Sequence, residues 1–79
     1  MRLRRRSREM ARKITLSDIY ETIARSLREF GYPDATAATV RETHAAMKSG
    51  EGIPHGIVGR FAEGQLIDYG NELDRLEER

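Results

Sequence analysis

Residues 14–30, ITLSDIYETIARSLREF, decide the fold of this chain. Large apolar side chains recur in this stretch at the spacing of one face of an α-helix: Leu16, Ile19, Tyr20, Ile23, Leu27 and Phe30. Thr15 is suited to cap the helix at its start, and Asp18 completes a capping box. Gly31 and Pro33 are suited to end it. Because such an apolar face has to be covered, we predict a packed helical domain.

The remaining chain predicts two more helices and a short terminal one. The second helix is expected to begin at Asp34 or Thr36 and to end near Ser49, and the third to span residues 57–69. Gly70 and Asn71 then either kink the segment or end it, with Asn71 capping a short fourth helix. The predicted core lies between three helices and contains Ile19, Ile23, Leu27, Val40, Met47, Ile57, Phe61 and Leu66. The fold class is therefore all-α, a small three-helix domain with a short fourth helix or a kinked C-terminal extension.

Charge divides the chain into two parts. Residues 1–13 contain seven basic residues and one acidic residue, a net charge of +6. Residues 14–79 contain seven basic and twelve acidic residues, a net charge of −5. Self-repulsion disfavours a packed structure in the first part. We therefore expect a disordered basic arm over residues 1–13 and a helical domain over residues 14–79.

Length and composition exclude several classes of protein. The 79 residues suffice for one domain, and without cysteine that domain has neither disulfides nor a thiolate metal site. No apolar run approaches the roughly 20 residues that span a bilayer, and no signal peptide is recognisable. We expect a cytoplasmic protein that does not enter a membrane. The preference for Arg over Lys, twelve to two, favours a bacterial or phage origin.

The residues that could perform chemistry form no known catalytic pattern. His44 and His55, the two histidines, are eleven residues apart and match no metal-ligand spacing. No nucleophile elbow surrounds a serine, and the loop over residues 50–56 lacks the Gly-Lys-Ser/Thr ending of a phosphate-binding loop. We expect no enzyme activity, no cofactor, no metal and no small-molecule substrate.

An apolar stripe near the C-terminus suggests a contact surface. It comprises Leu66, Tyr69, Leu73 and Leu76, at spacings of three, four and three. A compact three-helix unit does not reach Leu73 and Leu76, because ten residues of helix add roughly 15 Å. Either a fourth helix folds back to cover them or a second chain does. We take the stripe as a candidate partner-binding site and expect a non-enzymatic interaction module that acts as a homodimer or an adaptor.

The segment over residues 31–47, GYPDATAATVRETHAAM, supports an alternative function. It is locally similar to the DNA-binding domain of the arginine repressor family, in which a Gly-led turn precedes a Thr-x-Ala-Thr-Val helix. The similarity covers 17 of 79 residues. It departs from the family where Arg41 and Glu42 replace Ser-Arg, and no strand pair for a wing follows. The resemblance implies that four side chains face a DNA groove: Thr36, Thr39, Arg41 and Thr43.

The basic arm would add phosphate contacts to this helix-turn-helix-like regulator. Its candidate residues are Arg2, Arg4, Arg5, Arg6 and Arg8. The acidic charge of residues 14–79 opposes an approach to phosphate. An ordinary pair of antiparallel helices is the other interpretation of the same segment, and it favours the protein-interaction module.

Overall fold

The computed structural model describes residues 14–77. Four helices follow one another, α2 (Leu16–Phe30), α3 (Ala37–Ser49), α4 (Gly56–Asp68) and α5 (Gly70–Glu77), and this part of the chain contains no strand. The predicted all-α fold is thereby confirmed. The predicted basic arm, residues 1–13, lies outside the described residues, and so do its five candidate phosphate contacts.

Helix α2 begins and ends where its sequence predicts. The Thr15 hydroxyl accepts a hydrogen bond from the Asp18 amide at 3.2 Å, and the Asp18 carboxylate accepts one from the Thr15 amide at 2.9 Å. Gly31 ends the helix with φ 124°, a conformation that residues with a Cβ avoid. The next amide, of Tyr32, donates to the carbonyl of Leu27 at 3.0 Å. Hydrogen bonds from neighbouring residues therefore cap the helix at both ends.

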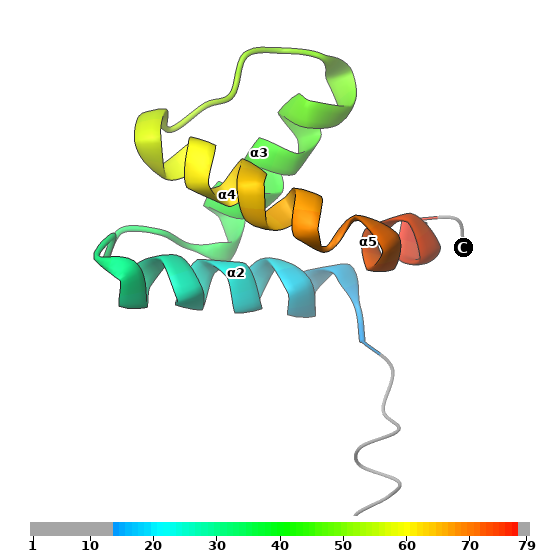
Figure 1. The fold of residues 1–79 in the computed structure, drawn as a ribbon, viewed down its shortest axis with the longest axis horizontal. Coiled ribbons are helices and arrows are strands. Elements are labelled where there is room, and N and C mark those ends of the chain that lie inside the picture. Colours follow the sequence, from blue (N-terminus) through cyan, green and yellow to red (C-terminus); the bar gives the residue numbers. More distant parts are fainter. Residues whose placement is uncertain (1–13, 78–79) are drawn as a thin grey trace, which may run out of the picture.

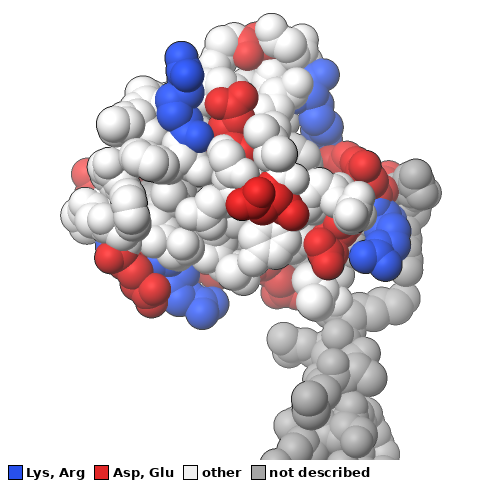
Figure 2. Space-filling model, viewed as in Figure 1, with Lys and Arg blue, Asp and Glu red and all other residues white. Residues whose placement is uncertain are grey.

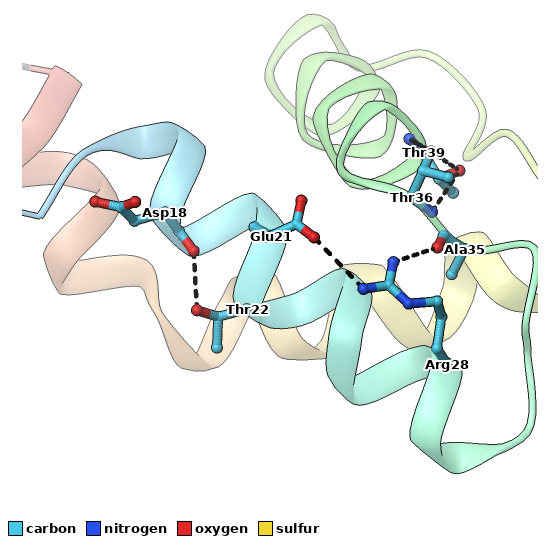
Figure 3. A network of polar contacts seen from close by, with 7 residues as sticks. All are labelled: Asp18, Glu21, Thr22, Arg28, Ala35, Thr36 and Thr39. Atoms are coloured by element: carbon cyan, nitrogen blue, oxygen red, sulfur yellow. Dashed lines mark hydrogen bonds and ion pairs between the residues drawn. The ribbon is translucent and has the colours of Figure 1, made fainter.

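Helix α3 starts with a second capping box and is tied to α2 through an arginine (Figure 3). Thr36 and Thr39 exchange side-chain to backbone hydrogen bonds of 3.3 Å in both directions. Arg28, in the last turn of α2, donates to the carbonyl of Ala35 at 2.8 Å and lies 3.4 Å from the carboxylate of Glu21. This side chain therefore fixes the loop between α2 and α3.

The core lies where α2, α3 and α4 pack together, with α4 crossing in front of α3 (Figure 1). Its most buried large side chains are Ile23, Leu27, Leu66, Val40 and Thr43. Each helix of this packing thus contributes to one continuous cluster. The side-chain nitrogen and oxygen atoms buried within residues 14–77 all have hydrogen-bond partners.

The loop before α4 is held by two close contacts. His55, the residue that precedes α4, has the left-handed backbone conformation with φ 69°, and its Nε2 lies 2.6 Å from a carboxylate oxygen of Glu42 on α3. One turn later, Gly59 lies against the loop so closely that a Cβ atom would be 1.8 Å from the carbonyl oxygen of Pro54. A residue larger than glycine does not fit at position 59.

Helix α4 ends at Asp68 and α5 begins two residues later. The Tyr69 amide still donates to carbonyls of α4, at 3.1 Å to Gln65, and the Leu73 amide then donates to Tyr69 at 2.9 Å. Asn71 lies inside α5 and does not cap it, contrary to the prediction that placed a cap there. At its far end α5 returns to α3, where Lys48 and Glu77 form an ion pair of 2.8 Å.

Candidate interaction surface

The C-terminal stripe that we predicted to bind a partner lies mostly in the core. Leu66 and Leu73 are 1% and 4% exposed, and Tyr69 and Leu76 are half-buried against the same cluster. The structure therefore covers the stripe within a single chain, and α5 does so as an extension of α4 beyond a bend at Tyr69 and not by folding back (Figure 1). Leu66 and Leu73 leave almost no surface for a second molecule.

Large apolar side chains are exposed instead on the opposite side of α4. Ile57 is 60% exposed, Ile67 63% and Phe61 38%, and Phe30 at the end of α2 is 67% exposed. The predicted placement of Ile57 and Phe61 in the core, and of Phe30 on the buried face of α2, is therefore wrong. Four of the five exposed large hydrophobic residues found within residues 14–77 belong to this region, and the fifth is Ile14.

Helical geometry places these α4 residues on one face. Ile57, Phe61 and Gly64 follow at spacings of four and three, and Ile67 comes three residues after Gly64. We call these four residues the α4 apolar face. The inward side of the same helix is formed by Gly59, Ala62 and Leu66. Helix α4 thus carries large apolar side chains on its outer side as well as on the side that the fold covers.

Three aromatic rings extend the α4 apolar face toward the end of α2. The ring centroid of Phe61 lies 5.4 Å from that of Phe30 and 5.6 Å from that of Tyr32, and the Phe30 and Tyr32 centroids are 6.2 Å apart. These separations are typical of stabilising aromatic pairs. This aromatic cluster, Phe30, Tyr32 and Phe61, therefore holds its members in place on the surface before any partner binds.

Charged side chains border this region. Figure 2 shows an uncharged area at the left of the molecule, with basic and acidic side chains at its edges. Arg60 and Asp68 are the exposed charged residues of α4 that flank Gly64, four residues to either side. Within residues 14–77 neither of them takes part in an ion pair.

The four residues predicted to face a DNA groove differ in exposure and in their contacts. Thr36 and Thr39 are engaged in the capping box at the start of α3. The Thr43 side chain is fully buried, and its hydroxyl donates to the carbonyl of Thr39 at 3.0 Å. Arg41 is exposed, but the neighbouring carboxylate of Glu42 contacts His55. Of the four candidates, Thr36 and Arg41 are exposed, Thr39 is partly buried, and Thr43 is removed from solvent by the fold.

Four polar side chains from α2, α3 and α5 form a network. The Tyr20 hydroxyl lies 2.8 Å from Nδ1 of His44, and Nε2 of His44 lies 3.5 Å from the carboxylate of Glu77, which in turn pairs with Lys48. Burial lowers the pKa of His44, and the Glu77 carboxylate partly opposes this. Burial also raises the pKa of Tyr20. The buried Tyr20 and His44 and the exposed Glu77 thus connect α2, α3 and α5, and sequence spacing alone did not predict their contact.

A shallow groove of about 370 Å³ lies between the first half of α2 and the junction of α4 with α5. Its lining residues are Ile14, Asp18, Ile19, Thr22, Arg25, Tyr69 and Glu72. The Thr22 hydroxyl donates to the backbone carbonyl of Asp18 at 2.9 Å, and the Asp18 carboxylate belongs to the α2 capping box. The described part of the chain holds no group of three His, Cys, Asp or Glu side chains placed to bind a metal ion.

None of the helices described over residues 14–77 has the length and apolar character needed to cross a membrane. No protein-family model matches the chain, and no curated protein or solved structure is significantly similar to it.

Proposed function

We propose that this chain is a small, non-enzymatic protein-interaction module whose contact surface is the α4 apolar face together with the aromatic cluster. The observation that carries the proposal is the exposure of Phe30, Ile57 and Ile67, each at least 60%, beside the rings of Phe61 and Tyr32. Contiguous apolar surface on a small domain is typical of sites that bind other proteins.

The energetics of the surface support the same conclusion. At roughly 200 Å² for a large side chain, the exposed fractions of Phe30, Ile57, Phe61 and Ile67 leave on the order of 400 Å² of apolar surface in water. Aromatic residues are enriched at the centres of protein interfaces, because they bury a large area at a small cost in side-chain entropy. The aromatic cluster reduces that cost further, since its three rings already contact one another.

This surface differs from the C-terminal stripe that the sequence suggested, although the proposed function is the same. Leu66 and Leu73 now stabilise the fold, and Tyr69 and Leu76 contribute only their exposed edges. The contact surface therefore moves to the other side of α4.

Site-specific photocrosslinking in the host cell tests the proposal. A benzophenone side chain is introduced at Ile57 or at Ile67, and Ala45, which is exposed on α3, provides the matched control position. We expect a discrete adduct from positions 57 and 67 but not from position 45. The adduct from position 67 should disappear when Phe61→Asp is added. Equal labelling from all three positions, or persistence after Phe61→Asp, would show that the surface is not a specific binding site.

A DNA-binding regulator is the second candidate function. It draws on the net charge of +6 over residues 1–13, which suits non-specific contact with phosphates. The engaged or buried positions of Thr36, Thr39 and Thr43 leave the arm as the main support for this candidate.

A further inference from the structure

Among residues 14–77, no contact explains the glycine at position 64. It lies in the middle of α4, is exposed, and a Cβ atom added to it would meet no other atom within 4 Å. Glycine is the poorest helix former apart from proline, so an exposed mid-helix glycine requires a reason. For Gly59 that reason is the carbonyl of Pro54. The space in front of Gly64, by contrast, is open, and a missing side chain there permits another backbone to approach closely.

The side chains that precede Gly64 are suited to pair with those that follow it at the same distance along α4. Arg60 lies four residues before Gly64 and Asp68 four residues after it, and Phe61 and Ile67 lie three residues before and after. If a second α4 crosses the first at Gly64 in the antiparallel direction, each residue meets the one equally far on the other side. Arg60 then meets the partner's Asp68, and Phe61 meets the partner's Ile67.

We infer that two copies of this chain pair through antiparallel α4 helices, about a twofold axis at Gly64. The inference rests on the proposed function, because it uses the same α4 apolar face and names its occupant. Twofold interfaces are self-complementary, so one arginine and one aspartate per chain make two ion pairs. Both groups lack an ion-pair partner among residues 14–77, and eight residues of helix hold them roughly 12 Å apart, too far to pair within one helix.

The available area fits a weak dimer. Interfaces are about 57% apolar, so some 400 Å² of apolar surface corresponds to roughly 700 Å² buried on each chain, within the range of specific complexes. Antiparallel helices that cross near 20° approach most closely where small residues face each other. Gly64 of both chains lies at that point, with the larger Phe61 and Ile67 on either side. We expect a dissociation constant of about 1–100 μM.

Sedimentation equilibrium of the full chain tests the pairing. We expect Gly64→Gln to raise the dissociation constant at least about tenfold, because its side chain separates the two backbones while the open space around it preserves the fold. Ala45→Gln adds the same side chain to the exposed surface of α3 and should change nothing. Circular dichroism verifies that both variants retain their helices. A wild-type chain that stays monomeric up to about 0.5 mM, or unchanged association of Gly64→Gln, would overturn the inference.

Charge exchange tests the antiparallel register independently of Gly64. Arg60→Glu alone places acid opposite the partner's Asp68, and Asp68→Lys alone places base opposite the partner's Arg60, so each variant should associate about tenfold or more weakly than the wild type. A mixture of the two variants should form a heterodimer with both ion pairs restored. If the mixture associates no better than its components, this register is wrong.

The photocrosslinking experiment distinguishes failure of the homodimer from failure of the interaction module. In the photocrosslinking experiment, an adduct with twice the mass of the chain supports self-pairing. An adduct of any other mass from positions 57 and 67 retains the interaction module and overturns the homodimer. The absence of any adduct, combined with a monomeric chain, overturns both.

Discussion

The Tyr20 hydroxyl on α2 lies 2.8 Å from Nδ1 of His44 on α3, with both side chains buried and the two rings edge to face. Nε2 of the same imidazole faces the carboxylate of Glu77 at 3.5 Å. The pKa of Glu77 is lowered by its hydrogen bond from Lys48, so its carboxylate is ionised at neutral pH and only accepts. We therefore assign the His44 proton to Nε2, so that Nδ1 accepts a hydrogen bond from the Tyr20 hydroxyl.

Replacing Tyr20 by phenylalanine tests this assignment. The Tyr20→Phe ring keeps the packing but leaves the buried Nδ1 of His44 without a donor, so we expect the free energy of unfolding to fall by about 1–3 kcal/mol. Urea denaturation measures the change. In a His44→Leu background the same substitution should cost much less, because no acceptor remains to be satisfied. Equal losses in both backgrounds would show that the hydroxyl acts on something other than His44.

The stability of the domain should depend on pH through His44. Burial lowers the pKa of His44 in the folded chain below the unfolded value of about 6.5, so the unfolded chain binds the proton more readily. The contribution of neutral His44 to stability is complete at pH values above the pKa that the residue has in the unfolded chain. It is lost as the pH falls from there through the lower pKa of His44 in the folded chain. We expect the free energy of unfolding to decrease between pH 7.5 and about pH 5, by at most about 1.4 kcal/mol per pH unit.

Urea midpoints across this range provide the measurement, with His44→Gln as the comparison. The glutamine cannot take up a proton, so the variant should have a flatter profile than the wild type. Profiles of equal slope would show that the acid sensitivity arises from other groups. Glu77 has its pKa lowered by Lys48 and so titrates below this range.

The residues of α2 show how much of the fold the sequence determines. Thr15, Asp18 and Gly31 act on their immediate neighbours in the chain, so their pattern alone predicts both ends of the helix. Thr36 at the start of α3 could be recognised for the same reason. Local hydrogen bonding and the spacing of apolar residues therefore suffice for α2 and for the start of α3.

The packing of α4 could not be predicted in this way. Leu66 and Phe61 are both large and apolar, but only the first is buried, and nothing local separates them. Which side of α4 is buried depends on the bend at Tyr69 and on the contact between Glu77 of α5 and Lys48 of α3. These two residues are 29 positions apart in the sequence. Because these contacts are long-range, the sequence did not reveal that Leu66 and Leu73 are buried within the chain.

Two glycines of α4 should respond oppositely to alanine. At Gly59 a new Cβ would collide with the Pro54 carbonyl at 1.8 Å and with Ile53 at 2.9 Å, so we expect Gly59→Ala to destabilise the domain by about 2 kcal/mol or more. At Gly64 the space is open, and Gly64→Ala should stabilise the chain by up to about 1 kcal/mol. Thermal unfolding is compared at dilutions where the midpoint no longer depends on concentration. Destabilisation of the dilute chain by Gly64→Ala would reveal a contact within the monomer.

The Thr36 hydroxyl should contribute to stability and not to DNA binding. It caps the amide of Thr39, so Thr36→Ala should lower the free energy of unfolding by about 1 kcal/mol. Thr36→Asp should retain most of the stability, because a carboxylate also accepts at this position and suits the positive end of the helix dipole. If Thr36→Ala leaves the urea midpoint unchanged, the capping hydrogen bond makes no contribution to the free energy of unfolding.

The basic arm allows the DNA-binding alternative to be tested apart from the helices. If Arg2, Arg4, Arg5, Arg6 and Arg8 contact phosphates, the logarithm of the affinity for duplex DNA should fall with the logarithm of salt concentration at a slope of about −4.5. Fluorescence anisotropy with labelled DNA measures this slope. A chain that lacks residues 1–9 should bind no DNA, while Arg41→Gln, on the exposed side of α3, should bind as the full chain does. A loss of affinity in Arg41→Gln that differs between DNA sequences would instead place α3 in a groove, because only base contacts carry sequence information. The arm and the α4 apolar face thus give separate readouts, one sensitive to salt and one to the apolar side chains around Gly64.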